Sequence, residues 1–350
     1  MKVVHVTRDF PPRSNGGIST AVGGLVAALV GRGIECAVVS FDGYRPTRKD
    51  PCPGPPTYDD STIEVVRVTH PGQVAQARDW ARSLGADISH CHHDLLWELA
   101  SDLETKHKVV TAHVLQREQN RLRQLEHDTL SSKAQDRAVS DADRVFAPSR
   151  AAAEILRQDY PEIPTIQFVP LAITDRVLVE RQRDVVVCLG RFSDVRGTGD
   201  LIDALPLIAA ARPDAHLAFV GGAPDNPRAE RRWLQQIDEA ASKTGLHIHR
   251  PGWVAGDEVW TWLERAQLVV VPSWVETFGM AAAEAMLAGA AVIGSDIGAL
   301  RELVDDSTGV LVPPRNPLAL GNAVVELLGD EPRRQSLGRA ARRRIQQQWT

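Results

Sequence analysis

The chain has 350 residues, with 40 Lys and Arg against 45 Asp and Glu, and a formal net charge of −5. This length suits two domains better than one. The weakly acidic balance, spread over both halves, argues against nucleic acid or an anionic membrane surface as a partner.

Short apolar segments alternate with longer helical ones, which predicts parallel sheets with right-handed crossovers. Seven segments are expected to form a first sheet: Val3 to Val6, Glu35 to Ser40, Ile63 to Val68, Ile88 to Cys91, Val109 to Ala112, Arg144 to Ala147 and Thr165 to Val169. Six are expected to form a second: Val185 to Leu189, His216 to Val220, Leu246 to His249, Leu268 to Val271, Ala291 to Gly294 and Val310 to Val312. The predicted fold class is therefore α/β, with two doubly wound, Rossmann-like domains.

The domain boundaries are expected where the composition changes. Residues 1–172 would form an N-terminal domain, 173–184 a linker, 185–332 a C-terminal domain and 333–350 a C-terminal helix. That helix carries six arginines, which is usual for a solvated face. The segment 42–60, with five prolines and two glycines, is expected to be a loop.

Other features predict a cytoplasmic protein. The start, Met1-Lys-Val-Val-His-Val, has no apolar signal-peptide core, and no apolar run approaches the roughly 20 residues of a membrane span. The four cysteines are far apart and are expected to be buried, reduced thiols. They are Cys36, Cys52, Cys91 and Cys188.

Two glutamates, Glu276 and Glu284, straddle a predicted strand–loop–helix junction. Both should therefore lie near the carboxyl end of a parallel strand, where ligands bind in open α/β sheets. The helix start would also leave the backbone N–H groups of Phe278, Gly279 and Met280 free to donate. The pair would also suit a hydrolase or a helix cap. However, nothing places one carboxylate on each side of a glycosidic bond, and Glu284 lies beyond the first turn.

Arginines and glycines at other strand ends suit a phosphate group. Arg191 follows a predicted strand, Arg196 lies in the next loop, and a guanidinium matches phosphate oxygens well. From spacing alone, two solvent-facing loop arginines explain the pattern equally well. Gly16 and Gly17 lie between the first strand and the first helix, where backbone N–H groups can cradle an anion. The turn lacks the G-x-G-x-x-G pattern of dinucleotide binding.

Histidines stand near several strands. His113 ends the strand 109–112, where a lone histidine is more often a structural hydrogen-bonding residue. The run from His90 to Asp94 looks like a metal cluster, but alternate strand side chains point to opposite faces, so convergence is not expected. His247 and His249 share a strand face, without an evident third ligand. No metal is expected.

Taken together, the motifs resemble the retaining glycosyltransferases of family 4. That family carries two glutamates at this spacing with Phe-Gly between them, after a Val-Pro-Ser element. The resemblance covers nearly the whole chain and is strongest from about residue 183 to 330. Further matching elements are Gly190-Arg191, Arg196-Gly197, Ala285-Met286, Gly289, Asp296-Ile-Gly298, Glu302 and Gly309-Val-Leu-Val. The family usually has Lys at the position of Arg196. The resemblance implies a B-type glycosyltransferase fold, with the two domains facing across a cleft.

The resemblance also implies roles for the residues. Arg191 and Arg196 would hold the diphosphate of a sugar nucleotide, and Glu284 its ribose. Glu276 would hold the donor sugar, helped by the three N–H groups named above. The remaining implied contacts are Gly252, Trp253 and Val254 against the base, Gly16 and Gly17 near phosphate, His113 beside the reacting centre and His92 in the acceptor cleft. Asp141-Ala-Asp143 matches the motif of metal-dependent glycosyltransferases, but this family needs no metal.

The implied function is transfer of a sugar, with retention, from a nucleoside-diphosphate sugar to an acceptor hydroxyl, without metal or other cofactor. The N-terminal domain shows no basic amphipathic helix for a lipid surface, so a small soluble acceptor is expected. Two alternatives stay open: a sugar-nucleotide 2-epimerase of the same fold, and a catalytically silent sugar-nucleotide-binding protein.

Overall fold

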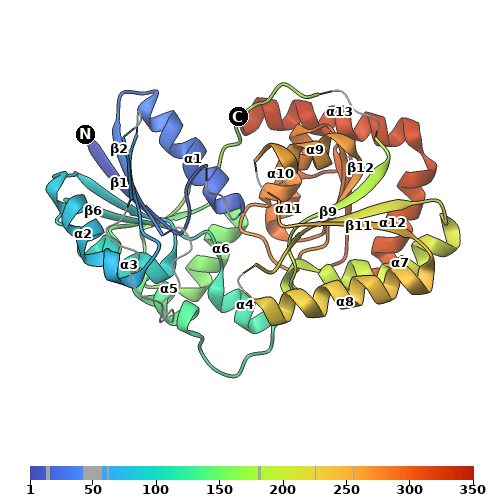
Figure 1. The fold of residues 1–350 in the computed structure, drawn as a ribbon, viewed down its shortest axis with the longest axis horizontal. Coiled ribbons are helices and arrows are strands. Elements are labelled where there is room, and N and C mark those ends of the chain that lie inside the picture. Colours follow the sequence, from blue (N-terminus) through green and yellow to red (C-terminus); the bar gives the residue numbers. More distant parts are fainter. Residues whose placement is uncertain (13–15, 42–56, 61–62, 180–182, 225, 255) are drawn as a thin grey trace. The chain divides into compact units, whose positions relative to one another are not determined.

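A computed structural model describes the chain at residues 1–12, 16–41, 57–60, 63–179, 183–224, 226–254 and 256–350. The chain divides into two compact units, Met1–Ala172 and Ile173–Thr350. Each unit is an α/β structure built on one sheet (Figure 1). None of the described helices is long and apolar enough to cross a membrane.

The sheet of the first unit has the strand order β3-β4-β2-β1-β5-β6-β7-β8. All neighbouring strands are parallel except β3 and β4, which are antiparallel. The strands are β1 (Lys2–Thr7), β2 (Glu35–Ser40), β3 (Thr57–Asp60), β4 (Glu64–Arg67), β5 (Ile88–Cys91), β6 (His107–Thr111), β7 (Arg144–Ala147) and β8 (Ile166–Phe168). The prediction of a loop over 42–60 is wrong for residues 57–60, which form β3. The sequence Thr-Tyr-Asp-Asp has no apolar run, so no local pattern indicates the antiparallel pairing of β3 with β4. The rest of that segment, with Cys52, lies outside the described residues.

The helices of the first unit follow the crossovers between these strands. They are α1 (Gly17–Val30), α2 (Val74–Ser83), α3 (Trp97–Ser101), α4 (Gln116–Leu122), α5 (Leu130–Asp141) and α6 (Arg150–Asp159), with short 3-10 turns η1 (Pro71–Gln73) and η2 (Asp94–Leu96). Thr129 caps α5 and Ser149 caps α6, each accepting a hydrogen bond from a first-turn N–H at 3.1 and 3.0 Å. The order β4-β2-β1-β5 reverses direction between β1 and β5, as in other doubly wound sheets.

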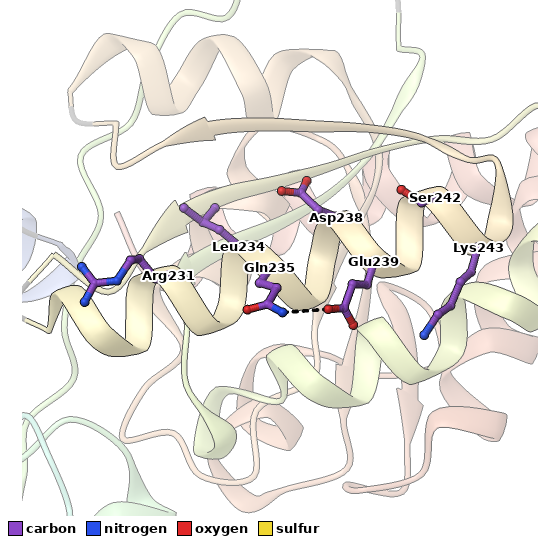
Figure 2. A pocket seen from close by; sticks show the side chains of 7 residues that line it. All are labelled: Arg231, Leu234, Gln235, Asp238, Glu239, Ser242 and Lys243. Carbon is purple, nitrogen blue, oxygen red and sulfur yellow. Dashed lines mark hydrogen bonds between the residues drawn. The ribbon is translucent and has the colours of Figure 1, made fainter.

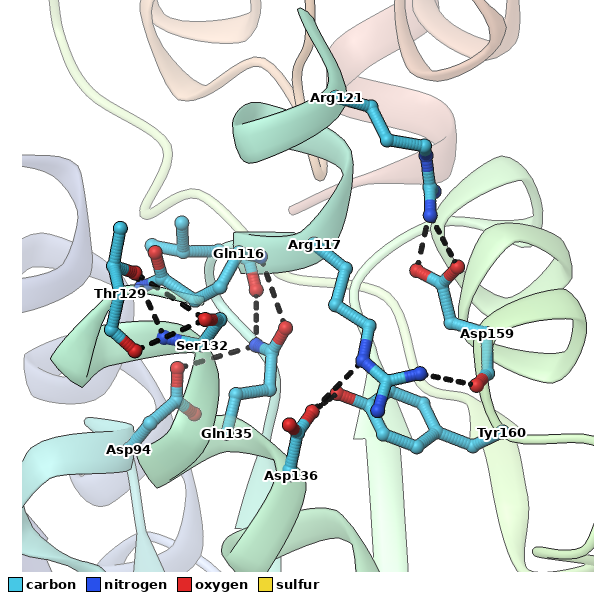
Figure 3. A network of polar contacts seen from close by, with 11 residues as sticks. Asp94, Gln116, Arg117, Arg121, Thr129, Ser132, Gln135, Asp136, Asp159 and Tyr160 are labelled. Carbon is cyan, nitrogen blue, oxygen red and sulfur yellow. Dashed lines mark hydrogen bonds and ion pairs between the residues drawn. The ribbon is translucent and has the colours of Figure 1, made fainter. Parts of the chain in front are cut away.

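A polar network ties α4 to its neighbours (Figure 3). Gln135 donates to Asp94 at 3.1 Å and accepts from the N–H of Gln116 at 2.9 Å. Burial raises the pKa of Asp94 to about 7, although hydrogen bonds from the side chains of Gln116 and Gln135 lower it. On the other face of α4, Arg117 bonds Asp136 at 2.8 Å. These bonds fix α4 against α5, beside the segment that begins at His113.

The sheet of the second unit is wholly parallel, with the strand order β11-β10-β9-β12-β13-β14. Its strands are β9 (Val185–Arg191), β10 (His216–Gly222), β11 (His247–Gly252), β12 (Ala266–Val271), β13 (Ala291–Ser295) and β14 (Gly309–Val312). Counted within the unit this is the order 3-2-1-4-5-6. The strand order therefore reverses between β9 and β12, and ligands bind at such a point in open α/β sheets.

Helices cover the second sheet, with a core of aliphatic and aromatic side chains that includes Leu205, Phe219, Ile237 and Ile293. They are α7 (Thr198–Ala211), α8 (Pro227–Thr244), α9 (Asp257–Arg265), α10 (Met280–Leu287), α11 (Gly298–Leu303), α12 (Pro317–Gly329) and α13 (Glu331–Gln348), with the 3-10 turn η3 (Asp194–Arg196). The C-terminal helix α13 packs against α10, α12 and β13 of this unit. The segment expected to be a linker is also held here, since Ile173 is buried and its N–H donates to the carbonyl of Trp349 at 2.8 Å.

Candidate functional site

The strands β9 and β12 bring the predicted site of the second unit together. They pair in parallel, so the segments that follow them leave the sheet at the same edge. Gly197, in the loop after β9, has φ +68°, and a Cβ there would lie 1.9 Å from the carbonyl oxygen of Pro272 after β12. The N–H of Trp274 also donates to the carbonyl of Val195 at 2.9 Å. Only glycine permits this approach, which sets Arg196 beside the loop that carries Glu276.

Arg196 and Glu276 form an ion pair between Nη1 and Oε1. The hydroxyl of Ser273 donates to the same carboxylate oxygen at 2.9 Å. The Glu276 side chain is only 10% exposed, whereas Arg196 is 35% exposed. The two predicted ligand-binding residues are thus partners of each other, and a bound phosphate would share Arg196 with Glu276.

Arg191, at the end of β9, lies against Trp253. Its guanidinium carbon is 5.2 Å from the centre of the indole ring, which is a cation–π distance. Trp253 follows Gly252 at the end of β11 and, like Val254, is partly buried. Its indole N–H is buried and has no hydrogen-bond partner among the described residues. Trp253 therefore packs against the guanidinium of Arg191.

The turn before α10 is held by tight packing. Gly279 has φ +99°, and a Cβ there would lie 2.7 Å from Cδ2 of Leu300. Phe278 is 2% exposed and its ring meets that of Trp349 edge-on at 5.2 Å. No side chain caps α10, which begins at Met280. Glu276 thus binds Arg196 and Ser273 instead of capping the helix, and the first N–H groups of α10 receive no side-chain cap.

Glu284 lies one turn into α10 and is partly buried. Its carboxylate accepts no hydrogen bond from any residue that the structure describes, and burial raises its pKa to about 7. A half-buried carboxylate without donors is costly unless something supplies them. Two hydroxyl groups of a ligand would do so.

Trp274, two residues before Glu276, contacts both an acidic and a basic side chain. Its indole N–H donates to Asp200 at 2.6 Å, and the guanidinium carbon of Arg315 lies 4.1 Å from its ring centre. Burial raises the pKa of Asp200, which the hydrogen bond from Trp274 opposes. These contacts join α7 and the start of the 272–279 loop, a pairing over more than 70 residues that no local pattern indicates.

In the first unit, the corresponding edge of the sheet carries a chain of histidines. Nδ1 of His5 lies 3.1 Å from Nε2 of His92, and Nδ1 of His92 lies 3.1 Å from Nε2 of His113. Their exposed fractions are 0%, 2% and 9% in the same order. Burial lowers the pKa of His5 to about 4 and that of His113 to about 3, and lowers the pKa of His92 well below its usual value. All three imidazoles are therefore neutral at pH 7.

The expectation that the histidines of the 90–94 run do not converge is wrong in part. His90 and His92, two residues apart, share a sheet face, and His5 stands opposite His90 on the paired strand β1. The sequence signal was present, because a histidine amid the buried residues of β1 needs a polar partner. Nε2 of His90 is 2.8 Å from the hydroxyl of Thr111, and both nitrogens of His92 bond other histidines. No ring nitrogen of His92 is left for a direct contact with an acceptor.

Other predicted residues of the first unit are placed as follows. Gly16 precedes α1 and Gly17 begins it, while the neighbouring residues 13–15 lie outside the described part. Asp143 accepts from the N–H of Lys108 at 2.8 Å, and Asp141 accepts from the indole N–H of Trp97 at 3.4 Å. Both carboxylates thus have structural partners. Among the described cysteines, Cys36, Cys91 and Cys188 are free and buried.

A shallow depression on the second unit lies away from this chemistry (Figure 2). Its lining comes from α8 alone: Arg231, Leu234, Gln235, Asp238, Glu239, Ser242 and Lys243. Gln235 and Glu239 bond each other at 2.9 Å, one turn apart. A depression on one solvated helix face, with no strand end contributing, offers no convergent set of groups.

Comparison with known families decides the class of the protein. The family described as "Glycosyltransferase Family 4" matches residues 15–175, and "Glycosyl transferases group 1" matches residues 183–330. The chain belongs to glycosyltransferase family 4. It is a retaining glycosyltransferase that uses a nucleotide sugar, and it has the GT-B fold.

Relatives of this family 4 enzyme align over most of its length. It is 29% identical to a GDP-mannose-dependent α-(1-6)-phosphatidylinositol monomannoside mannosyltransferase of Mycobacterium tuberculosis, over 99% of this chain and 94% of that protein. It is 27% identical to the α-maltose-1-phosphate synthase of Mycolicibacterium smegmatis, over 98% of this chain and 94% of that protein. A D-inositol 3-phosphate glycosyltransferase of Xylanimonas cellulosilytica is 31% identical, but the alignment spans only 52% of this chain and 43% of that protein.

Solved structures share the fold at lower identity. The sucrose-phosphate synthase of Thermosynechococcus elongatus matches 100% of this chain and 95% of its own, with a TM-score of 0.80 and 21% identity. Anabaena HepE, crystallised with UDP-glucose, matches with a TM-score of 0.76 and 19% identity, over 100% of this chain and 95% of its own.

Proposed function

We propose that this glycosyltransferase moves a sugar from a nucleoside-diphosphate sugar to a hydroxyl of a small soluble acceptor, without a metal ion. The observation that carries the proposal is the group of charged side chains at the switch point of the second sheet. Arg191 ends β9, Arg196 and Glu276 follow β9 and β12, and the carboxylate of Glu284 accepts no hydrogen bond from any described residue.

In the donor half of the reaction, Arg191 and Arg196 hold the diphosphate and stabilise the charge that grows on it as the anomeric C–O bond breaks. The uncapped N–H groups at the start of α10 add donors. Glu284 accepts the ribose hydroxyls. Glu276 accepts donor-sugar hydroxyls, and its negative charge favours the cationic character that develops at the anomeric carbon. The base lies against Trp253 and Val254.

In the transfer step, the acceptor oxygen forms a bond to the anomeric carbon on the face that the diphosphate leaves. The acceptor proton passes to a phosphate oxygen, so charge and atoms balance without an additional base. Retention follows because the attacking oxygen takes the side of the leaving group. The paired positive charges of Arg191 and Arg196 fill the role that a metal has in other glycosyltransferases.

We propose that the first unit binds the acceptor. The histidine chain ends at His113, the most exposed of its three members. Gly16 and Gly17, at the start of α1, would lie near the donor phosphate. His113 would hydrogen-bond the reacting sugar. Because both nitrogens of His92 are engaged by histidines, His92 is better explained as a positioning residue for His113 than as an acceptor contact. One relative is named for a small phosphorylated inositol, which supports a small acceptor. Another relative is named for a lipid acceptor, so a lipid is the alternative acceptor.

The direct test is a thermal-shift screen with UDP, GDP and ADP, followed by their sugar nucleotides, in the presence of excess chelator. A nucleoside diphosphate should raise Tm, because a ligand that binds only the folded state stabilises it. The sugar nucleotide selected is then incubated, isotopically labelled, with and without candidate acceptors. Formation of an epimer without acceptor would show that the protein is an epimerase and not a transferase. Binding without any turnover would indicate a catalytically silent protein.

A further inference from the structure

Three histidines of the second unit lie side by side at the amino ends of two strands. His216 begins β10, and His247 and His249 lie on β11. His216 and His247 are register partners in this parallel pair, and residues two apart on a strand share a face. The ring centres of His216 and His247 are 4.9 Å apart, and those of His247 and His249 are 4.4 Å apart. One ring nitrogen from each histidine lies within 4.8 Å of those of the other two.

This cluster differs from the buried histidines of the first unit. No residue that the structure describes forms a hydrogen bond to a ring nitrogen of these three, whereas the buried set is joined by hydrogen bonds. His216 and His247 are exposed, and His249 is half-buried, with its ring centre 5.6 Å from that of Trp262 on α9. Rotation of the exposed rings about their side-chain torsions would close the distance that a shared ligand needs.

The charge beside the cluster is balanced. Arg265 lies close enough to affect His249, and the positive charge of Arg265 would by itself repel a cation. Its guanidinium is bonded to the carboxylate of Asp184 at 3.0 Å, so the pair contributes little net charge.

We propose that His216, His247 and His249 form a binding site for a divalent transition-metal ion of the Zn²⁺ class. Imidazole nitrogens suit Zn²⁺, Ni²⁺ and Cu²⁺, and three histidines with one water complete a four-coordinate zinc site. The ion would link β10 to β11 through these three side chains. It would not take part in sugar transfer, because Arg191 and Glu276 lie beyond the opposite ends of the strands, about 20 Å away for a strand of this length.

The site has a structural consequence for the edge of the sheet. β11 is an edge strand, and its pairing with β10 is irregular between Ala218 and Val220. Edge strands expose unpaired backbone groups and are open to wrong pairing. A metal that links His216 to His247 and His249 would hold the first residues of β10 and β11 in register.

The test uses the full chain without a polyhistidine tag, freed of metal by a chelator. Titration with Zn²⁺, followed by calorimetry, should show one site per chain. His247→Ala should weaken Zn²⁺ binding by at least about tenfold. Replacing a residue that only hydrogen-bonds a metal ligand already costs about this much in affinity, and His247 would itself be a ligand. Zn²⁺ should raise Tm of the unaltered chain but not of His247→Ala. Co²⁺ should show the visible absorption of four-coordinate geometry only when the three histidines are intact.

A matched control is His127→Ala, which removes an exposed histidine of the first unit and should leave Zn²⁺ binding unchanged. Tm measured without metal establishes that each variant folds. Equal Zn²⁺ affinity of His247→Ala and the unaltered chain would overturn the proposal. So would loss of binding in His92→Gln with retention in His247→Ala, since the ion would then lie in the buried cluster.

Discussion

Nδ1 of His92 lies 3.1 Å from Nε2 of His113, and the other ring nitrogen of His92 lies at the same distance from His5. A neutral imidazole has one N–H, so three neutral rings supply three protons, and two of them occupy the two links. The third resides on Nδ1 of His113 or on Nε2 of His5, which is buried without a partner among the described residues. The tautomer of His113 is thus coupled, through His92, to the tautomer of His5.

Replacing His92 should therefore act on turnover rather than on nucleotide binding. We expect His92→Phe to lower kcat by up to about 10²-fold, because misplacing a reacting group has this effect. The Kd of nucleoside diphosphate, whose proposed site is in the other unit, should not change. His92→Gln should restore part of the activity, since its amide can donate and accept. Cys91→Ala, at the buried neighbouring position, controls for packing. Unaltered kcat in His92→Phe would remove the positioning role.

The two arginines should carry the affinity for diphosphate. The double variant Arg191→Ala with Arg196→Ala should weaken nucleoside-diphosphate binding at least tenfold in calorimetry, because each charge-assisted hydrogen bond contributes roughly 1.5–3 kcal/mol. Arg339→Ala removes an exposed arginine of α13 and is the control. Unchanged affinity of the double variant would show that the phosphates bind elsewhere.

The variant Glu276→Gln distinguishes a role in donor-sugar transfer from a role in nucleotide binding. The ion pair with Arg196 means that loss of the carboxylate frees a phosphate-binding guanidinium. Affinity for free nucleoside diphosphate should thus stay equal or increase slightly. Turnover should fall by a factor corresponding to about 2–4 kcal/mol, the usual contribution of one preorganised electrostatic contact. A variant with lower Tm and normal turnover would assign Glu276 a structural role through Arg196 and Ser273.

The raised pKa of Glu284 predicts that the stability of the folded chain decreases as pH rises. Its pKa of about 7 in the folded chain is above its unfolded value of 4.5. The folded state therefore binds the proton more tightly, and stability from this group is lost as pH rises from 4.5 to 7. The full shift corresponds to about 3 kcal/mol. Since the group is half-buried, we expect Glu284→Gln to raise the free energy of unfolding at pH 8 by about 1–2 kcal/mol.

The same residue predicts how ligand affinity depends on pH. Ribose hydroxyls donate to the ionised carboxylate, so nucleotide affinity should decrease as pH falls below about 7. In Glu284→Gln that dependence should disappear and the affinity for every nucleotide should be lower. Calorimetry at pH 6 and pH 8 checks both statements. Identical profiles for the two proteins would contradict the ribose assignment.

Activity should not depend on a divalent ion. We expect equal transfer rates with and without excess chelator, because arginines neutralise the diphosphate. Asp141 and Asp143 already accept structural hydrogen bonds. A rate that is lost in chelator and restored by Mg²⁺ or Mn²⁺ would reverse this prediction.

The alternation of strands and helices, and with it the α/β class, follows from local patterns along the chain. Each buried parallel strand is a local apolar run, readable without its neighbours, as Leu268 to Val271 shows. The motif around Glu276 and Glu284 likewise showed its strand–loop–helix form, because proline, glycine and alanine act through local backbone preference. The strand β3 was missed because it has no apolar run and no local pattern indicates its pairing with β4.

Which polar groups meet follows from the packing of the folded chain and not from any local pattern. The partnership of Arg196 with Glu276 joins residues 80 apart, and that of His5 with His92 joins residues 87 apart. Such pairs depend on which strands are neighbours in the sheet and on close approaches such as that of Gly197 to Pro272. Side-chain chemistry is local, but hydrogen bonding and burial depend on distance in space. For that reason candidate site residues could be proposed from the chain, while their partners and the pKa of Glu284 could not be read from it.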